Sequence, residues 1–240
     1  MIDLVSLYYW VIGLGYFAPV LVILIIKSYF QSPQEYDPWL RKKANTLFRL
    51  LNSTPQIEYS EELPVDKPFI FMANHGSLID LPLLKAMIPH YYTGIVAQES
   101  FKYFLFGPAI QRMGSIAIHR DNIRSSLKSF ERATELLKTG IQIVVLPEGS
   151  RSLDGKLIPF RKLPFHFAKQ SGASIVPVAI SGVFEMNNKK SFYLRPGKII
   201  VRFAPTIHAE EIASMEIKDL MELTRQRIHE NLEEFEAGNS

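Results

Sequence analysis

The 240-residue sequence contains no cysteine, which excludes disulfide frameworks, zinc sites built on thiolates and cysteine nucleophiles. It also lacks an excess of charge, since 27 lysines and arginines against 24 aspartates and glutamates leave a net charge of +3. This balance argues against bulk binding of nucleic acid, but it leaves room for a local basic patch that faces a membrane or a phosphate. No residues have the spacing of a metal cluster, so we expect no metal ion and no resident cofactor.

One long apolar run stands out in a chain that is 47% apolar. No charged residue lies between Asp3 and Lys27, and positions 4–26 are almost wholly apolar or aromatic. A helix of this length rises about 34 Å, enough to cross the ~30 Å hydrocarbon core of a bilayer. A cleaved signal peptide fits less well, because the run is too long and no basic residue precedes it. We therefore predict a membrane helix.

A second helix is predicted from Asp37, with Asp37 as N-cap and Pro38 at the first helical position. Apolar residues follow at helical spacing, and basic residues lie off that stripe: Leu40, Ala44, Leu47, Phe48 and Leu51 against Arg41, Lys42 and Arg49. The pattern fits an ordinary packed helix or an amphipathic helix at a membrane interface, and its place after the apolar run favours the interface. The basic residues after the run place the remaining chain in the cytoplasm. We predict anchoring helices in residues 1–53 and one further domain in residues 54–240.

From about residue 68 onward, short apolar runs alternate with longer amphipathic segments. The predicted strands are Phe69–Met72, Thr93–Ala97, Ser115–His119, Ile141–Leu146, Ser174–Ile180 and Lys198–Ala204. The predicted helices are Leu81–Met87, Phe101–Arg112, Ile123–Thr139, Pro164–Lys169 and a last helix from Ile217 to Phe235. This alternation predicts a layered α/β domain with a mostly parallel or mixed sheet.

His75 and Asp80 follow the first of these strands, five residues apart, with Gly76 between them. If a turn separates them, the Asp80 carboxylate can accept a hydrogen bond from one ring nitrogen of His75 and leave the other free to take a proton from a substrate hydroxyl. The stretch Ser77-Leu78-Ile79-Asp80 is also a capping-box pattern, in which Asp80 would only satisfy backbone donors. By itself the segment fits both interpretations.

A second polar cluster, Pro147-Glu148-Gly149-Ser150-Arg151-Ser152, follows the apolar run that ends at Leu146. Ligands bind at the carboxyl ends of strands in open α/β sheets. An ordinary turn does not require glutamate and arginine beside Gly149, whereas a phosphate site uses the planar fork of an arginine. The spacing is not that of a Walker loop, because Leu157 stands where serine or threonine would hold magnesium.

Together these segments resemble the glycerolipid acyltransferases, and most closely the 1-acylglycerol-3-phosphate O-acyltransferase family. The first family motif, NHxxxxD, matches Asn74-His75 to Asp80, and the third, FPEGTRS, matches Leu146 to Ser152. The second motif, a glycine followed by a short apolar strand and an arginine, matches Gly114 to Arg120, and an apolar strand with a central proline matches Ile175 to Ala179. Order and spacing agree over roughly residues 65 to 205.

The resemblance implies an O-acyltransferase that forms phosphatidic acid for phospholipid biosynthesis. His75, oriented by Asp80, would deprotonate the free hydroxyl of lysophosphatidic acid, at the sn-2 position, as it attacks the thioester of acyl-CoA or acyl carrier protein. No acyl-enzyme is needed, since cysteine and a G-x-S-x-G elbow are both absent. The implied substrate-binding residues are Asn74, Arg120, Glu148, Gly149, Ser150 and Arg151.

Alternative acceptors remain open from the sequence: glycerol 3-phosphate, another lysophospholipid or a lyso-aminolipid. A non-catalytic lipid-binding relative is a further alternative, which the intact pair of His75 and Asp80 disfavours. The expected location is the inner membrane of the cell, with the catalytic domain on the cytoplasmic side. The apolar helix either spans the bilayer or dips into one leaflet, and Pro19 and the need to reach a lipid hydroxyl at headgroup depth favour dipping. The chain departs from the family at Ala97-Gln98 and Phe104, in place of a lysine pair and a proline, which points to a change in acyl-chain fit.

Overall fold

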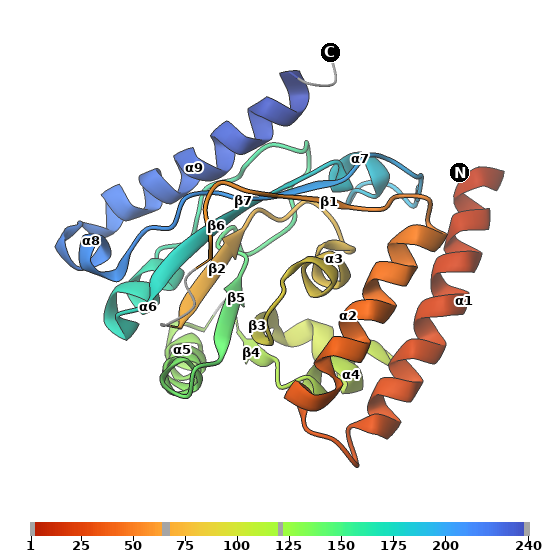
Figure 1. Ribbon diagram of the computed structural model, residues 1–240, viewed down its shortest axis with the longest axis horizontal. Coiled ribbons are helices and arrows are strands. Elements are labelled where there is room, and N and C mark those ends of the chain that lie inside the picture. Colours follow the sequence, from red (N-terminus) through yellow and green to blue (C-terminus); the bar gives the residue numbers. More distant parts are fainter. Residues whose placement is uncertain (1–2, 64–67, 120–121, 238–240) are drawn as a thin grey trace.

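The computed structural model describes residues 3–63, 68–119 and 122–237. Within these residues a seven-stranded sheet forms the middle of the molecule, with helices on both faces (Figure 1). The strands are β1 (Gln56–Tyr59), β2 (Phe69–Ala73), β3 (Tyr92–Ala97), β4 (Ile116–Ile118), β5 (Gln142–Val145), β6 (Ser174–Ser181) and β7 (Ile200–Phe203). The helices are α1 (Leu4–Lys27), α2 (Pro33–Leu50), α3 (Asp80–Met87), the 3-10 helix η1 (Gln98–Lys102), α4 (Phe106–Arg112), α5 (Ile123–Lys138), α6 (Leu163–Ser171), α7 (Val183–Met186), α8 (Ala209–Ser214) and α9 (Ile217–Ala237).

The sheet is mixed, with the strand order β1-β7-β6-β2-β5-β3-β4. The five strands from β6 to β4 are parallel to one another, β7 is antiparallel to β6, and β1 is parallel to β7. The predicted α/β class is confirmed, and all six predicted strands are present with ends within two residues of those expected. Strand β1 was not predicted, because its four residues are all exposed and no buried apolar run marks it.

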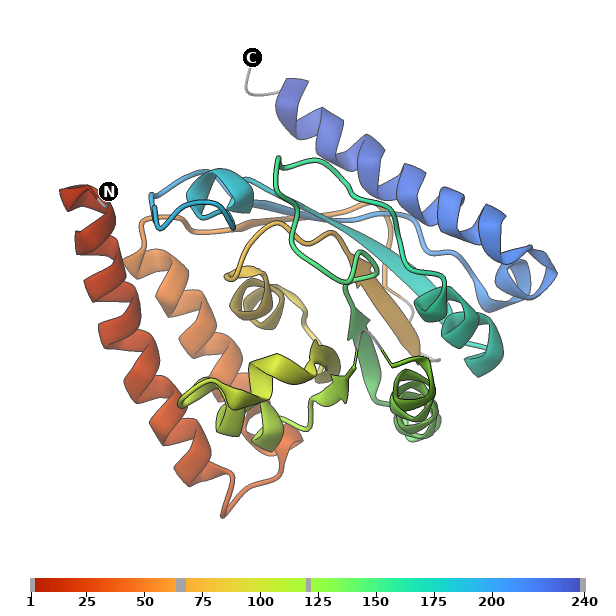
Figure 2. The ribbon, with the colours of Figure 1, turned by 180° about the vertical axis from the view of Figure 1, so that it is seen from behind.

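Two hydrophobic cores lie on opposite faces of the sheet. Strand β2 is buried throughout, and its side chains alternate: Phe69 and Phe71 join one core, whereas Ile70 and Met72 join the other. Helices α2 and α3 cover the first face, and α5, α6 and α9 cover the second (Figures 1 and 2). This burial on both faces explains why the central strands are recognisable in the sequence as continuous apolar runs.

Helix α2 begins at Pro33, earlier than predicted. Ser32 caps it by accepting the Glu35 N–H, and the Glu35 carboxylate accepts the Ser32 N–H, so the capping box lies upstream of the predicted cap at Asp37. Asp37 is instead buried inside the helix, where its carboxylate lies 2.7 Å from Lys85 Nζ and 2.9 Å from Arg41 Nε. The predicted cap at Asp37 is therefore wrong, because the upstream serine and glutamate form the stronger start signal.

The apolar stripe of α2 packs inside the protein rather than facing outward. Ala44, Leu47 and Phe48 belong to the core beneath the sheet, so the apolar face on which the interfacial interpretation rested is not available to a bilayer. Helix α1, which stands beside α2, exposes a long apolar face at this end of the molecule (Figure 1). By length and composition α1 is the one helix among the described residues that is long and apolar enough to cross a membrane.

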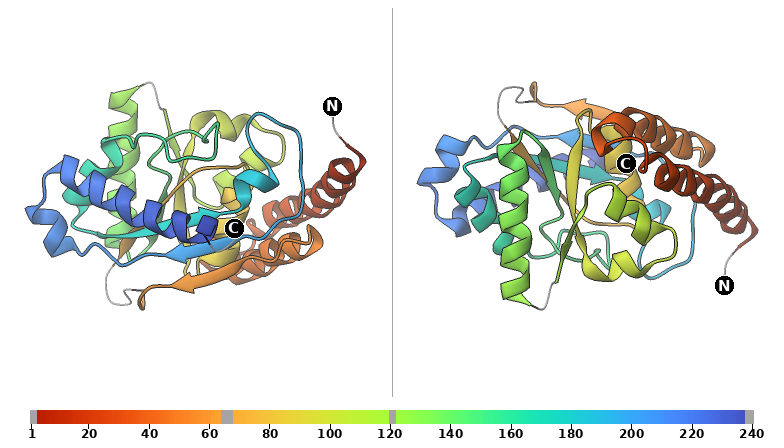
Figure 3. Two further views of the ribbon diagram at one scale, coloured as in Figure 1. Left: turned by 90° about the horizontal axis from the view of Figure 1, so that it is seen from above. Right: turned by 90° about the horizontal axis from the view of Figure 1, so that it is seen from below.

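Helix α1 lies along the domain over its whole length. Near its start, Trp10 Nε1 donates to the Phe192 carbonyl at 2.7 Å, and Asp3 forms an ion pair with Arg195. Near its end, Leu24 packs in a cluster with Leu40 of α2 and Ala109 of α4. Figure 3 shows α1 at the opposite end of the molecule from α8 and the start of α9.

Candidate active site

The two polar motifs meet at one edge of the sheet because the strands that precede them are parallel neighbours. Strand β2 leads into Asn74 and His75, and β5 leads into the segment 147–152. Met72 and Val145 are partners in the β2–β5 register, so both loops leave the sheet at the same level. The carboxyl edge of a parallel sheet is the usual place for a ligand in such folds.

The side chain of His75 is oriented by Asp80. His75 Nδ1 lies 2.7 Å from Asp80 Oδ2, and the same oxygen accepts hydrogen bonds from the backbone N–H groups of Gly76 and Ser77, each at 2.9 Å. Asp80 is fully buried at the first position of α3, while the His75 side chain is 15% exposed. Because the carboxylate accepts from Nδ1–H, Nε2 is left as the nitrogen that can take a proton.

Both sequence interpretations of this segment describe part of the geometry. The Asp80 carboxylate accepts the Ser77 N–H, as a capping box requires. The reciprocal bond is missing, however, since Ser77 Oγ accepts from Ile79 N–H at 3.4 Å and lies 3.3 Å from Asn187 Oδ1. The backbone bonds therefore hold the carboxylate in place, and the carboxylate in turn holds the imidazole.

The third motif clamps the peptide groups on either side of His75. Glu148 Oε1 accepts the His75 N–H at 2.8 Å, and the Ser152 N–H donates to the His75 carbonyl at 2.8 Å. The second oxygen of Glu148 accepts the Ile158 N–H at 3.2 Å. Burial raises the pKa of Glu148 to about 7. The hydrogen bonds from the His75 and Ile158 N–H groups lower this pKa, the charge of Asp80 raises it, and the charge of Arg225 lowers it. Glu148 thus positions His75 through its backbone.

Asn74 does not face the site. Its Nδ2 donates to the Ile180 carbonyl at 2.9 Å, and its Oδ1 accepts the Ile180 N–H at 2.7 Å, in a buried position. The side chain therefore continues the pairing of β2 with β6 beyond the last strand residue. The predicted substrate-binding role of Asn74 is replaced by a structural one, since both ends of its amide are already used within the protein.

Gly149 has a backbone conformation that favours glycine, with φ of +72°. A Cβ there would also meet Arg161 Cγ at 3.4 Å, so the Arg161 side chain lies directly against the loop. The Arg161 N–H donates to the Pro147 carbonyl at 2.8 Å. Sequence reasoning did not assign Arg161 to the site, although its place in Phe160-Arg161, just after the motif, was a usable signal.

The remaining predicted substrate-binding residues are Ser150, Arg151 and Arg120. Arg151 is half-buried, and neither Arg151 nor Ser150 forms a side-chain hydrogen bond or ion pair with another described residue. Both are therefore available to a ligand. Arg120 lies outside the described residues.

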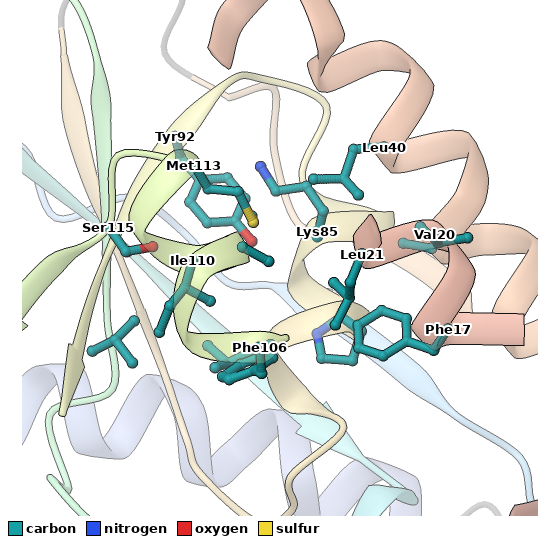
Figure 4. Close-up of a pocket in the computed structure, with 16 residues that line it drawn as sticks. Phe17, Val20, Leu21, Leu40, Lys85, Tyr92, Phe106, Ile110, Met113 and Ser115 are labelled. Carbon is teal, nitrogen blue, oxygen red and sulfur yellow. The ribbon is translucent and has the colours of Figure 1, made fainter. Parts of the chain in front are cut away.

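An apolar pocket begins on the helix that carries Asp80. Leu81 and Pro82, the next two residues of α3, line it together with Lys85 one turn further on. Figure 4 shows Lys85 among the side chains around the pocket. The other walls come from α1, α2, β3 and α4, and they include Phe17, Leu40, Gly94, Phe106, Ile110 and Met113. Hydrocarbon is the ligand that suits such walls. Sequence reasoning did not predict this pocket, because five elements build it. Among the described residues no group of histidine and carboxylate side chains could hold a metal ion.

The known proteins that this chain resembles, in sequence and in structure, are acyltransferases. Residues 54–181, more than half of the chain, match the sequence model of a family described as Acyltransferase. The chain is 30% identical over 167 residues to a 1-acyl-sn-glycerol-3-phosphate acyltransferase of Limnanthes douglasii, covering 69% of this chain and 59% of that protein. It is 30% identical over 179 residues to the Saccharomyces cerevisiae protein of the same name, covering 73% and 59%. The chain thus spans about three fifths of these relatives.

The crystal structure of the 1-acyl-sn-glycerophosphate (LPA) acyltransferase PlsC from Thermotoga maritima is similar over nearly the whole molecule. It superimposes with a TM-score of 0.83 at 26% sequence identity, covering 98% of this chain and 95% of that one. The superimposed part of this chain extends beyond the matched family segment and includes the N-terminal helices and α9. On the family match, with this structural likeness beside it, the chain belongs to the acyltransferase family.

Proposed function

We propose that this chain transfers an acyl group from a thioester to the sn-2 hydroxyl of lysophosphatidic acid and so forms phosphatidic acid. The observation that carries the proposal is the 2.7 Å contact between His75 Nδ1 and Asp80 Oδ2, beside a loop with an uncommitted arginine. The names of the relatives and of the similar structure support the same acceptor. Mere lipid binding would not require an oriented imidazole.

The reaction proceeds by direct transfer. As His75 Nε2 takes the hydroxyl proton, the acceptor oxygen bonds to the thioester carbonyl carbon. Collapse of the tetrahedral intermediate breaks the carbon–sulfur bond, and the leaving thiolate takes the proton held at Nε2. The chain has no cysteine to form an acyl-enzyme, and the donor is acyl-CoA or acyl carrier protein, which present the same thioester.

Cations around the third motif hold the acceptor phosphate. Arg151 and Arg120, as the resemblance implies, form the clamp, and Arg161 adds a guanidinium against Gly149. Glu148, Gly149 and Ser150 shape the loop. Arg151→Ala should raise the KM for lysophosphatidic acid far more than the KM for the thioester, and Arg151→Lys should restore it only partly, because an ammonium lacks the bidentate fork. Equal effects on both substrates, or an equal effect of Arg132→Ala on exposed α5, would contradict this role.

The apolar pocket holds the acyl chain, and α1 attaches the enzyme to the bilayer. Because the domain packs against α1 from Asp3 to Leu24, α1 lies in the plane of one leaflet rather than across the bilayer. A single cysteine at Leu4 of this cysteine-free chain tests the arrangement in sealed vesicles. Labelling from the cytoplasmic side supports it, and labelling only from the other side indicates a spanning helix.

The deciding experiment uses the purified full chain in detergent with a panel of acceptors and both thioester donors, read by product mass. The acceptors are lysophosphatidic acid, glycerol 3-phosphate, other lysophospholipids and a lyso-aminolipid. We expect phosphatidic acid as the main product. Preference for another acceptor keeps the chemistry and replaces the substrate. Equal turnover by wild type and His75→Ala for every acceptor overturns the proposed activity.

A further inference from the structure

The turn between η1 and α4 exposes two large aromatic side chains. Phe104 is 91% exposed and Tyr103 is 57% exposed. An isolated exposed apolar residue requires no explanation, but two adjacent aromatic residues on a short turn form an exposed apolar patch, and such patches often mark interaction sites.

The turn is tightly held rather than loose. The Phe106 N–H donates to the Phe104 carbonyl at 2.7 Å, and the Gly107 N–H donates to the Tyr103 carbonyl at 2.8 Å. Leu105 has φ of +58°, a conformation that leucine rarely adopts, and a Cβ on Gly107 would come within 2.1 Å of the Phe101 carbonyl oxygen. The backbone therefore accepts strain while it turns Phe104 outward.

The inner side of the same turn packs on α1. Leu105 and Phe106 lie against the cluster that contains Leu21 of α1, and Phe106 and Phe17 line the same pocket (Figure 4). Figure 2 shows the segment between η1 and α4 beside α1. At the other end of α4, the guanidinium of Arg112 lies 4.4 Å from the Tyr29 ring, in the exposed turn after α1. The aromatic turn and the exposed side of α1 thus belong to one rigid unit.

We propose that Tyr103 and Phe104 insert into the same lipid leaflet as the exposed face of α1 and form a second membrane contact beside the acyl pocket. This inference rests on the lipid substrate proposed above. Aromatic side chains suit the depth where headgroups meet acyl chains. The cations on this unit, exposed Lys102 in η1 and Arg112 on Tyr29, complement anionic phospholipids.

The second contact gives the enzyme a fixed orientation. A single helix lying in a leaflet leaves the attached domain free to roll about the helix axis. The turn lies away from that axis, because η1 continues from the carboxyl end of β3, the same sheet edge at which His75 follows β2. Two contacts hold the active edge toward the bilayer, from which a single-chain lipid enters.

The absence of cysteine permits a direct test on the full chain. Single cysteines at Phe104, at Val11 on the exposed face of α1 and at Lys218 at the far end of the molecule are labelled with the environment-sensitive dye NBD. Each is mixed with vesicles of phosphatidylglycerol and phosphatidylethanolamine, with and without brominated acyl chains. We expect a blue shift and bromine quenching at positions 104 and 11 and neither at position 218.

The outcomes separate the two proposals. A response at position 11 without one at position 104 overturns the second contact and leaves the proposed function intact. Silence at both positions overturns the membrane setting of the proposed function together with this inference.

A second variant measures what the contact contributes. Phe104→Ser should lower partitioning onto the same vesicles about tenfold, from the apolar surface that no longer enters lipid. Phe104 does not line the acyl pocket, contrary to the change in acyl-chain fit expected from the sequence, so turnover of detergent-dispersed lysophosphatidic acid should stay at the wild-type value. Leu127→Ser, at an exposed leucine on α5, should change neither quantity. An equal loss in vesicles and in detergent would show a merely structural role and would overturn the inference.

Discussion

His75 is the residue on which the proposed chemistry depends, since its Nε2 is the one ring nitrogen that Asp80 leaves free. We expect His75→Ala to lower kcat at least ~100-fold, the lower end of what general-base catalysis supplies. The melting temperature in detergent should stay close to that of wild type, because the Asp80 carboxylate keeps its bonds from Gly76 and Ser77. His166→Ala, an exposed histidine on α6, is the matched control. A folded His75→Ala enzyme with near wild-type turnover would instead favour a purely capping role for Asp80.

Glu148 makes the stability of the enzyme depend on pH. Its pKa is about 7 in the folded protein against an ordinary value of 4.5, so the folded state binds more protons between these values. Stability from this group is therefore fully present below pH 4.5 and is lost as pH rises through 7, by about 3 kcal/mol.

Glu148→Gln tests this dependence, because an amide does not titrate. The urea-induced unfolding of wild type and variant is compared from pH 4.5 to pH 8 in one detergent. The advantage of wild type over Glu148→Gln should shrink as pH rises. A gap that stays constant or widens would show that Glu148 is ionised throughout the range.

Residue roles were predictable where partners are close in sequence. The pairing of His75 with Asp80 was one of two interpretations that the five-residue spacing allows, and the resemblance to the acyltransferase motif favoured it. The family motif implies a substrate-binding role for Asn74, whereas its partner Ile180 is 106 positions away, and no local pattern indicates such a contact. The Asp37-Pro38 step likewise predicts a helix cap, whereas the partner of Asp37, Lys85, lies 48 positions further along the chain.

At the scale of elements, the buried pair of Lys85 and Asp37 joins α2 to α3, the helix that begins with Asp80. Burial lowers the pKa of Lys85, against the attraction of Asp37. Lys85→Met should destabilise the protein by about 3 kcal/mol, because among the described residues it leaves the buried Asp37 carboxylate with Arg41 as its remaining ion-pair partner.

The double variant Asp37→Leu/Lys85→Met is the informative comparison, since it removes both charges together. It should recover most of the stability in urea unfolding, as replaced buried pairs do elsewhere. If the double variant is as unstable as the sum of both single variants, the pair contributes through packing rather than through charge.

Elements were predictable to the extent that burial marks them. Six strands were found because apolar runs mark them, most clearly in the fully buried β2 and β6, while the exposed edge strand β1 left no signal. The start of α2 was misplaced because two dipeptides, Ser32-Pro33 and Asp37-Pro38, each have the residues typical of a helix start. Only Ser32-Pro33 is followed by a glutamate at the third helical position.

At the scale of the whole molecule, the parallel neighbours β2 and β5 bring the two loops of the candidate site together, while α1, α2, α3, β3 and α4 build the pocket beside them. No sequence pattern specifies this pocket, because the strand order and the packing of α1 on α4 create it. Its size should therefore set which acyl chains are transferred, independently of the chemistry at His75.

Two substitutions of residues that line the pocket should shift the chain-length preference in opposite directions. Gly94 lies in β3 on the pocket wall, and a Cβ there meets Val96 Cγ2 at an ordinary 3.7 Å, so Gly94→Val adds bulk and should favour shorter chains. Met113→Ala removes bulk and should favour longer ones. Each methylene gained or lost in the pocket is worth about 0.8 kcal/mol, or about fourfold in kcat/KM.

The measurement is kcat/KM over a series of thioesters from ten to eighteen carbons, about the range natural acyl chains cover, judged against the ~0.8 kcal/mol expected per methylene. Leu127→Ala, on the far face of the sheet, should leave the profile unchanged because α5 takes no part in the pocket. If both pocket variants lower all chain lengths equally, the acyl chain binds elsewhere. In that case we expect the acyl chain to lie along the exposed apolar face of α1, where the part of the chain outside the protein is in the leaflet itself.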